Sequence, residues 1–423
     1  FLDAFDASYS VVGNDSDTFY VVTNREAPRY KLVAVGLGKP QPKQWKTLIA
    51  EQPGKSVLED VRMVNNRFVT VWITDARSTV HLYDLKGKPL KEIVLPEIGS
   101  VGGFTGRRVD KETFYSFSSY LYPTTIYRYD FQKGSSEVWK KPSVSFYGAG
   151  YETVQVFYPS KDGTPIPMFI TYRKGLRRNG ENPTLLYGYG GFNVLQRPGF
   201  SPAAAGWLAM GGIYAVANLR GGGEYGQEWY DAGRLKNKQN VFDDFIAAAE
   251  YLIREGYTST PKLAIQGGSN GGLLVGACLN QRPDLFGAAL PAVGVMDMLR
   301  FHKFTIGWAW KSDYGDPEKK EDFEAAYRYS PLHNVKPGTR YPATLVTTAD
   351  HDDRVAPLHS FKYTAALQAA QAGPAPVLIR IETKAGHGSG KPTDKIIEER
   401  ADMYSFLLRE LKMTLPQGYG ENP

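Results

Sequence analysis

The first 140 or so residues alternate between apolar and polar positions in short runs, which is typical of strands with one buried face. The segment Val35-Gly36-Leu37 is echoed by Tyr83-Asp84-Leu85 and by Tyr129-Asp130-Phe131, at spacings of 48 and 46 residues. Each echo ends an alternating run and precedes a turn rich in Gly, Lys or Pro. A repeat of roughly forty to fifty residues with several strands per unit is typical of β-propeller blades. Residues 1–141 are therefore predicted to form about three blades, with an irregular β-sandwich as the alternative.

After Lys141 the pattern changes to short, continuous apolar runs that alternate with helical stretches. A predicted hairpin opens this part, with strands Val154–Tyr158 and Met168–Tyr172. The strands expected after it are Thr184–Tyr187, Ile213–Ala217, Leu263–Gln266, Ala343–Thr347 and Val377–Ile381. The expected helices are Val241–Glu255, Gly271–Asn280, Leu358–Ala370 and Asp394–Leu411. Strands buried on both faces that alternate with helices predict a mostly parallel α/β sheet over residues 142–423.

The composition fits two globular domains and narrows the classes of partner. A chain of 423 residues is long for one compact core. The net charge of +6 is spread along the chain instead of gathered in basic blocks, so we expect no nucleic-acid partner. The single cysteine, Cys278, excludes an intramolecular disulfide and a zinc cluster built on cysteines. We expect no cofactor and no metal.

The longest apolar stretch, Pro202–Leu219, approaches the length of a membrane span. Glycines at 206, 211 and 212 interrupt it, and a short helix followed by the buried strand Ile213–Ala217 explains it better. We therefore expect no membrane partner, and a soluble monomer whose compartment, cytoplasm or periplasm, the sequence leaves open. Phe1 begins in the middle of a repeat without an initiator Met, so we expect the chain to be part of a longer polypeptide that completes the ring of blades.

A candidate nucleophile follows the third of the apolar strands. Gly267-Gly268-Ser269-Asn270-Gly271 has the form G-x-S-x-G, after the strand Leu263–Gln266 and at the start of a predicted helix. This strand–turn–helix setting is what a nucleophile elbow requires. Small neighbours let the strand and the helix approach, and the amide of Asn270 at the helix N-terminus points at the developing oxyanion. The pattern indicates Ser269 as a catalytic nucleophile.

In this kind of site the acid and then the histidine follow the serine along the chain. Of the six histidines, His387 lies downstream of both the serine and a suitable acid, in a glycine-flanked loop after Val377–Ile381. The acid is expected in the loop after Ala343–Thr347, which offers Asp350, Asp352 and Asp353. The residues alone do not choose among these three. The chosen acid would orient His387 and stabilise its imidazolium.

Five segments together resemble the prolyl oligopeptidase family, over residues 150–412 and in the family's order. They are Leu185–Asn193, Asn218–Gly226, Gly267–Gly272, Asp350–Val355 and Lys384–Pro392. The resemblance implies a seven-bladed propeller joined to an α/β-hydrolase domain, and a serine endopeptidase that cleaves short peptides after proline. It also implies Asp352 as the acid and Tyr189 as the second oxyanion donor beside the amide of Asn270.

The resemblance further implies a pocket for the proline ring. Trp310 matches the tryptophan that stacks on that ring, and Arg354 matches the arginine that holds a substrate carbonyl. The other walls of the pocket match Phe192, Val295, Tyr314 and Val355, with Ile306 and Ala309 nearby. A flat aromatic wall suits a rigid, uncharged ring. For Arg354, a surface ion pair with Asp353 is the alternative role.

Three alternative functions were weighed. A related oligopeptidase cleaves after Lys or Arg, but it needs carboxylates in the pocket, and Val295, Trp310 and Tyr314 supply none. An esterase or lipase on the same fold would not need a propeller that screens substrates by size. A propeller binding protein with a catalytically dead hydrolase domain would not need the triad together with both oxyanion donors. Short proline-containing peptides are therefore the expected partners.

Overall fold

The computed structural model describes residues 6–388 and 390–420, and the chain divides into two compact units. The first unit runs to Gly148 and also takes in two later segments, Arg197–Ser201 and Gly223–Trp229. The second unit comprises Ala149–Gln196, Pro202–Gly222 and the remainder from Tyr230 onward. The domain boundary expected between residues 141 and 142 stays a prediction.

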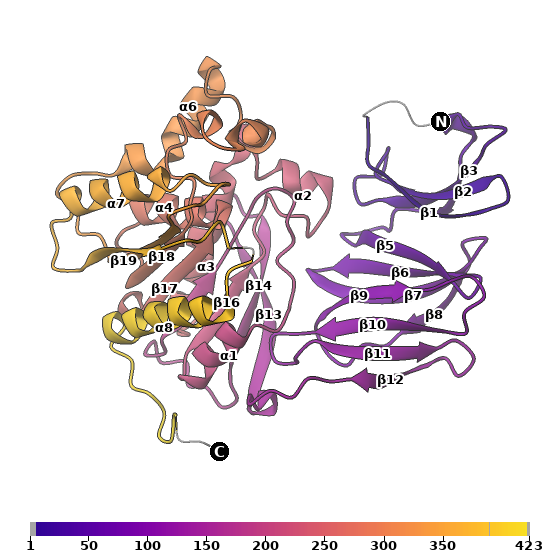
Figure 1. Ribbon diagram of the computed structural model, residues 1–423, viewed down its shortest axis with the longest axis horizontal. Helices are drawn as coiled ribbons and strands as arrows, with labels where there is room; N and C mark the ends of the chain where they lie inside the picture. Colours follow the sequence, from indigo (N-terminus) through magenta and orange to yellow (C-terminus); the bar gives the residue numbers. More distant parts are fainter. Residues whose placement is uncertain (1–5, 389, 421–423) are drawn as a thin grey trace. The chain divides into compact units, whose positions relative to one another are not determined.

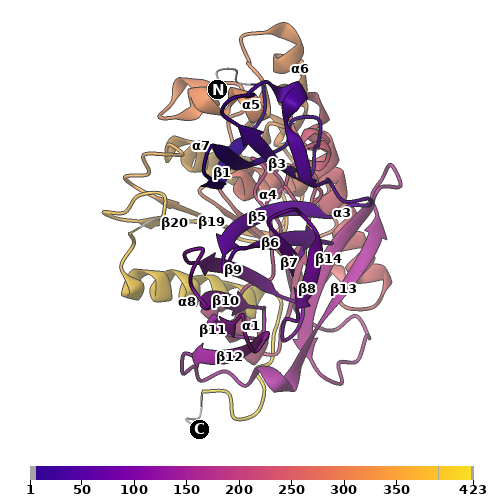
Figure 2. The same ribbon diagram turned by 90° about the vertical axis from the view of Figure 1, so that its right-hand side faces the viewer.

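The first unit contains three antiparallel four-stranded sheets, each made of strands that are consecutive in sequence (Figures 1 and 2). The first sheet has β1 (Tyr9–Asp15), β2 (Thr18–Thr23), β3 (Lys31–Gly36) and β4 (Lys46–Ile49). The second has β5 (Val57–Val64), β6 (Arg67–Thr74), β7 (Arg77–Asp84) and β8 (Pro89–Ile93). The third has β9 (Ser100–Thr105), β10 (Glu112–Ser118), β11 (Thr125–Asp130) and β12 (Ser135–Lys140).

These sheets confirm the predicted blades. The echoed positions 35, 83 and 129 fall in β3, β7 and β11, which are the third strands of their sheets. Alternating apolar residues of neighbouring sheets then pack face to face. Phe68 of β6 contacts Tyr20 of β2 edge-on at 5.0 Å between ring centroids, and Val71 of β6 lies in one buried cluster with Tyr115 of β10. The sequence repeat therefore reflects a repeated packing unit.

The second unit is built on an eight-stranded sheet in the order β13-β14-β16-β15-β17-β18-β19-β20. The hairpin β13–β14 is antiparallel to the rest, and the pairs from β16–β15 to β19–β20 are parallel. The strands are β13 (Tyr151–Pro159), β14 (Pro165–Arg173), β15 (Thr184–Tyr187), β16 (Ile213–Ala217), β17 (Leu263–Gly268), β18 (Ala288–Ala292), β19 (Ala343–Ala349) and β20 (Val377–Glu382). The predicted α/β-hydrolase class is confirmed.

Helices cover both faces of this sheet (Figure 1). They are α1 (Pro202–Ala209), α2 (Gln227–Asp231, counted largely with the first unit), α3 (Gln239–Arg254), α4 (Asn270–Gln281), α5 (Lys311–Tyr314), α6 (Lys320–Tyr329), α7 (Leu358–Ala370) and α8 (Thr393–Glu410). Trp207 of α1 and Leu407 of α8 pack with Ala264 and Leu290 of the sheet in one buried cluster. Helices α3, α4 and α7 cover the opposite face, so α4 is anchored directly behind the end of β17.

A buried ion cluster joins three elements of the second unit. Asp244 is fully buried, and both its oxygens bind Arg220, whose guanidinium also binds Asp162 at 2.5 Å. Ser160 donates to Asp244 at 2.6 Å. The cluster therefore ties the β13–β14 turn, the end of β16 and helix α3 together.

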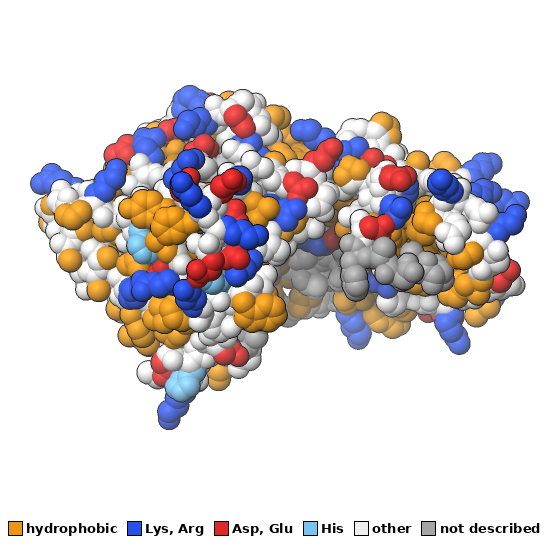
Figure 3. Space-filling model, turned by 90° about the horizontal axis from the view of Figure 1, so that it is seen from above, with side chains coloured by type: hydrophobic (Ala, Val, Ile, Leu, Met, Phe, Trp, Pro, Cys, Tyr) orange, Lys and Arg blue, Asp and Glu red, His pale blue; other side chains and the backbone are white. Residues whose placement is uncertain are grey.

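Positive and negative side chains are interspersed on the face shown in Figure 3, in keeping with the absence of basic blocks in the sequence. Within residues 6–388 and 390–420, no helix is both long and apolar enough to cross a bilayer. The same residues hold no group of three or more His, Cys, Asp or Glu side chains arranged to hold a metal ion.

Candidate active site

Ser269 lies on a sharp turn between β17 and α4. Its backbone has φ 60° and ψ −117°, a conformation that costs energy for a residue with a Cβ. The turn is held by the bonds Ser269 N to Ala292 O at 2.9 Å and Leu273 N to Ser269 O at 3.1 Å. The strained geometry lifts the hydroxyl out of the sheet edge while the start of α4 lies beneath it. This is the nucleophile elbow that the G-x-S-x-G pattern predicts.

The glycines of the elbow allow backbone to approach backbone. A Cβ on Gly267 would lie 2.3 Å from the carbonyl oxygen of Gly271, and one on Gly271 would lie 2.7 Å from that of Gly188. Both distances are far inside van der Waals contact, so a side chain at either position would push α4 away from the sheet. The glycines therefore fix where the first turn of α4, with its free N–H groups, meets Ser269.

The loop after β19 holds a carboxylate against the candidate base. Asp352 is 4% exposed; its Oδ1 accepts from the backbone N–H groups of Arg354 at 3.0 Å and Val355 at 2.9 Å. Its Oδ2 lies 2.7 Å from Nδ1 of His387. A carboxylate only accepts, so Nδ1 carries the proton and Nε2 is left with its lone pair. This is the orientation that a general base needs.

Of the three acids left open by the sequence, only Asp352 contacts His387. Asp350 instead pairs with the exposed His351 at 2.7 Å, and Asp353 is exposed. No hydrogen bond joins His387 to Ser269 among the described residues. Contacts between base and nucleophile are often long before substrate binds, so the distance alone does not remove His387 from the site.

Tyr189 lines the same cavity as the nucleophile. It follows β15 and is half-buried, and Ser269 is among the groups that act on its hydroxyl. Burial, reinforced by the nearby Tyr187 and Asp313, raises the pKa of Tyr189 to about 12. The phenol therefore stays protonated near neutral pH and can donate a hydrogen bond. It lies where a second oxyanion donor is expected, opposite the N-terminus of α4.

A cavity of about 320 Å³ opens at Ser269. Its lining comprises Tyr189, Phe192, Ser269, Val295, Ile306, Trp310, Tyr314 and Arg354. Phe192 meets Tyr314 edge-to-face at 5.4 Å, and Phe301 stacks behind Trp310 at 6.5 Å. None of the eight lining residues carries a carboxylate. The cavity is therefore suited to a compact, uncharged group.

The remaining pocket candidates are placed differently. Val355 is 2% exposed and lies behind the cavity, where its N–H holds Asp352. Ala309 is not part of the lining. Arg354 is exposed at the rim, and its guanidinium forms no ion pair with any residue that the structure describes. The alternative of a surface pair with Asp353 is thus not what the structure shows.

Two charged residues that had no predicted role lie directly behind this site. Lys238 and Asp313 are 1% and 0% exposed, and they contact the backbone of the Tyr189 loop and the side chain of Asn270. They are 75 positions apart, from 238 to 313, and no local pattern links them. Their pairing is therefore recognisable only in the folded structure, which brings Lys238 and Asp313 together.

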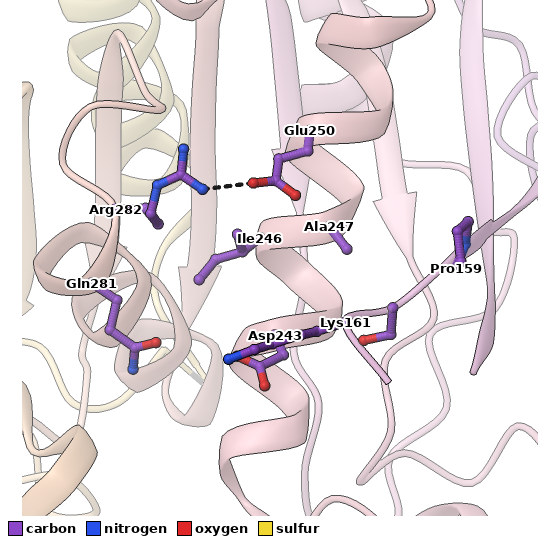
Figure 4. Close-up of a pocket in the computed structure, with 9 residues that line it drawn as sticks. Pro159, Lys161, Asp243, Ile246, Ala247, Glu250, Gln281 and Arg282 are labelled. Atoms are coloured by element: carbon purple, nitrogen blue, oxygen red, sulfur yellow. Dashed lines mark hydrogen bonds and ion pairs between the residues drawn. The ribbon is translucent and has the colours of Figure 1, made fainter. Parts of the chain in front are cut away.

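A second, larger pocket lies elsewhere in this unit. It has a volume of about 430 Å³ and runs between α3, the end of α4 and the residues after β13 (Figure 4). Figure 4 shows Arg282 reaching Glu250 across it, at 2.6 Å. It contains none of the candidate site residues. Arg282 and Glu250 are paired with each other, and we assign this pocket no chemistry.

The sheet order, the strained serine elbow and the Asp–His pair define an α/β hydrolase. Comparison with known proteins narrows the class. The model named "Prolyl oligopeptidase family" matches residues 198–414, and "Prolyl oligopeptidase, N-terminal beta-propeller domain" matches residues 1–142. The chain belongs to the prolyl oligopeptidase family, which confirms the resemblance seen in its sequence motifs.

Individual relatives agree. The chain is 50% identical over 411 residues to a prolyl endopeptidase of Elizabethkingia miricola, covering 97% of this chain and 58% of that protein. It is 43% identical over 432 residues to a prolyl endopeptidase of Dictyostelium discoideum, covering 98% and 56%. A solved structure from a study of two prolyl endopeptidases matches with a TM-score of 0.94 and 47% identity, covering 98% of this chain and 61% of the other. The chain thus spans less than two thirds of the length of these relatives.

Proposed function

We propose that this chain carries the catalytic machinery of a serine endopeptidase that cleaves short peptides on the carboxyl side of proline. Ser269 would attack the scissile carbonyl, His387 would take its proton, and Asp352 would hold the imidazole in the required tautomer. The oxyanion would bind the N–H of Asn270 and the hydroxyl of Tyr189. The expected intermediate is an acyl-enzyme that water hydrolyses.

The observation that carries the proposal is the uncharged aromatic cavity at Ser269. Trp310, Phe192 and Tyr314 give it flat walls, and Val295 completes it without adding a polar group. Proline is a rigid ring with no backbone N–H, so it leaves no donor unsatisfied in such a pocket. Arg354 at the rim remains available for the carbonyl of the residue before the proline. The named relatives are prolyl endopeptidases, which supports the same substrate class.

The cavity also separates this proposal from cleavage after Lys or Arg. A buried ammonium or guanidinium requires a paired carboxylate, since an unpaired buried charge is costly. The nearest buried acid behind the cavity, Asp313, already faces Lys238 at 3.6 Å and is fully buried. A basic substrate side chain would therefore meet aromatic and aliphatic side chains and the guanidinium of Arg354, without a carboxylate to pair with. A binding-only role leaves the strained serine backbone and the Asp352–His387 pair without a purpose.

The test is a comparison of two reporter peptides with the intact protein. A Gly-Pro reporter should be hydrolysed at least about 10²-fold faster than its Gly-Arg counterpart, because the arginine would be desolvated without a partner. The Ser269→Ala variant should lose about 10⁶ in kcat, as expected for a nucleophile. Faster cleavage of the Arg reporter would replace the proposal with the basic-specific alternative. Failure of a fluorophosphonate to label Ser269 would favour the binding module.

We further propose that the protein acts as a monomer, because every residue of the candidate site comes from one chain and one compact unit. Light scattering of the active protein would test this. Activity found only in a dimeric fraction would overturn it.

A further inference from the structure

Lys238 is a buried ammonium immediately behind the oxyanion donors. It precedes α3, and its Nζ donates to the carbonyl oxygen of Gly190 at 2.9 Å and to Oδ1 of Asn270 at 3.1 Å. It also lies over the ring of Tyr314, 5.3 Å from the centroid. One side chain therefore contacts the loop of one oxyanion donor, the residue that supplies the other, and a wall of the cavity.

Asn270 connects Lys238 to the loop that carries Tyr189. Its Nδ2 donates to the carbonyl oxygen of Tyr189 at 2.6 Å, while its Oδ1 accepts from Lys238 and from the Tyr314 hydroxyl at 2.9 Å. A Cβ on Gly191 would lie 2.6 Å from that Nδ2, so the loop is packed directly on the amide. The side chain of Asn270 thereby fixes the spacing between its own backbone N–H and the Tyr189 loop.

Asp313 holds the other end of the same loop. Its Oδ1 accepts from the backbone N–H of Phe192 at 3.2 Å, and its Oδ2 lies 3.6 Å from Lys238 Nζ. Burial lowers the pKa of Lys238, and the Asp313 carboxylate opposes that shift. Asp313 stands between Trp310 and Tyr314 in the chain, so it links the loop to the aromatic pocket.

The restrained loop is a strained one. Gly190, Phe192 and Asn193 have φ values of 65°, 55° and 57°, and a left-handed conformation is unfavourable for Phe192 and costs Asn193 less. Such a conformation persists only where the surroundings impose it. Asn270 packs against Gly191, and Lys238 at Gly190 O and Asp313 at Phe192 N–H hold this segment from behind. Without them the segment, and Tyr189 with it, is expected to relax.

We propose that Lys238 and Asp313 form a buried positioning pair that sets the distance between the two oxyanion donors and couples it to the proline pocket. Neither residue touches the reacting atoms. The inference rests on the proposed function only in taking Ser269 as the nucleophile and Tyr189 and Asn270 as the donors. A buried ion pair gives little net stability compared with apolar residues of the same size, so stability alone does not explain the presence of this one.

The test uses two reactions of the intact protein, each corrected with Ser269→Ala. One is the hydrolysis of the Gly-Pro reporter; the other is the hydrolysis of p-nitrophenyl acetate, which needs the oxyanion hole but no proline pocket. Lys238→Met should lower kcat about 10²-fold in both, with KM changing less than about threefold, because a displacement of about 1 Å at the reacting centre has that effect. Asp313→Asn should act in the same direction.

The double variant Lys238→Met/Asp313→Asn separates positioning from stability. Lys238→Met alone leaves Asp313 charged and unpaired, which should also lower the melting temperature. Adding Asp313→Asn removes the unpaired charge, so the melting temperature should recover while kcat stays about 10²-fold low. Recovery of kcat together with the melting temperature would overturn the proposal, since it would show that the pair only stabilises the fold.

A matched control comes from the same segment. Lys236 precedes Lys238 by two positions, is exposed, and pairs with Glu321 on α6. Lys236→Met should leave both reactions within about twofold of the wild type, as for most surface substitutions. If the wild type hydrolyses the ester but not the Gly-Pro reporter, the proposed proline specificity is wrong. The ester reaction then still tests the positioning pair. An unchanged ester kcat in Lys238→Met would overturn the proposal of a positioning pair and would leave the proposed function unaffected.

Discussion

At the scale of single residues, the proposed oxyanion site would use two different donors, a backbone N–H and a phenol. The N–H of Asn270 is fixed by helix α4, whereas the hydroxyl of Tyr189 depends on a side chain and on a strained loop. A donor of this kind acts mainly where charge develops, in the transition state. The two donors therefore differ in how easily a substitution can remove them.

Tyr189→Phe should lower kcat for the Gly-Pro reporter by about 10²–10³, with a smaller change in KM. The ring that lines the cavity is kept, and only the hydroxyl is lost. Steady-state kinetics would check this, with Tyr187→Phe, at the end of the preceding strand β15, as the control. A rise in KM at constant kcat would make Tyr189 a ground-state contact instead.

Because burial raises the pKa of Tyr189 to about 12, its hydroxyl is protonated throughout the neutral range. Between pH 7 and about 10, ionisation of this donor should therefore cause no loss of kcat in the wild type. A pH–rate profile of the wild type beside Tyr189→Phe would show parallel curves over this range. Convergence of the two curves below pH 10 would indicate that the phenol ionises earlier and has a different environment.

Trp310→Ala should weaken proline substrates through binding, by about 1–3 kcal/mol in kcat/KM, because it removes the stacked wall of the cavity. Trp308, two positions earlier, is 64% exposed and outside the cavity, so Trp308→Ala is the matched control. The measurement is the ratio of kcat/KM for proline and alanine reporters. An unchanged ratio in Trp310→Ala would place the specificity pocket elsewhere.

At the scale of elements, helix α7 carries a histidine whose charge state affects the stability of the fold. His359 is 1% exposed, and its Nδ1 accepts from the backbone N–H of Asp297 at 3.0 Å. Burial lowers its pKa to about 4, an effect that nearby Lys362 and Arg300 add to and Asp297 and Asp352 oppose. The neutral imidazole is thus part of the packing between α7 and the loop after β18.

The native state therefore binds the proton of His359 more weakly than the unfolded chain does. Above pH about 6.5 both states are neutral, and the interaction is fully present. As the pH falls from 6.5 to 4 the unfolded state gains the proton first, so this site should remove roughly 3 kcal/mol from the free energy of unfolding.

His359→Asn keeps an acceptor for Asp297 and removes the titration. The denaturant midpoint of this variant should fall less between pH 6.5 and 4.5 than that of the wild type. His351→Asn, at a side chain that is 73% exposed, is the control and should keep the wild-type slope. A slope of the His359→Asn variant equal to the wild type would assign the acid sensitivity to other groups.

The same scale shows what the sequence could predict. Three predicted elements agree with the structure at both ends: strands Thr184–Tyr187 and Ile213–Ala217 and helix Leu358–Ala370. The spacing of their apolar residues and the turns on either side identify these elements from the nearby sequence. Strand β18 was missed: Ala288–Ala292 has little β-propensity and contains Pro291, which argues against a central strand. It forms because β17 and β19 pair with it on either side.

The candidate site was predictable where the motifs are local and less so where partners are distant. The elbow around Ser269 follows from five consecutive residues and a preceding strand. The contact of His387 with Asp352 in place of Asp350 or Asp353 depends on which carboxylate the loop turns inward, which sequence pattern alone does not encode. Adjacent Asp243 and Asp244 look alike in sequence, yet only Asp244 meets Arg220 in the core.

At the scale of the whole molecule, the two units are interleaved along the chain. Segments Arg197–Ser201 and Gly223–Trp229 come from the second half of the sequence but are counted with the first unit. Within it, the N–H of Phe200 donates to Ser118 at 2.9 Å, and the Tyr225 hydroxyl donates to Asp75 at 2.8 Å. These two segments thus depend on the blades for their contacts.

Residues 149–423 made alone should therefore show these two segments as its weakest points. Phe200 would lose its bond to Ser118 and Tyr225 its bond to Asp75, and segments without such contacts are readily cleaved. Limited trypsin digestion followed by mass spectrometry should find early cleavage near Arg197 and Arg234 that the intact protein resists. Equal resistance in both would show that the segments are held by the second unit itself.

Interleaving also sets an order of events during synthesis on the ribosome. The blades up to Gly148 are complete 81 residues before Trp229, the last residue of their unit, has been added. At about 5–20 residues per second this is a delay of roughly 4–16 s. For that time the surface that later receives Tyr225 and Trp229 has no occupant, and nascent blades are open to chaperones. A slow codon cluster between positions 149 and 229 would lengthen that interval, whereas one after 229 would not.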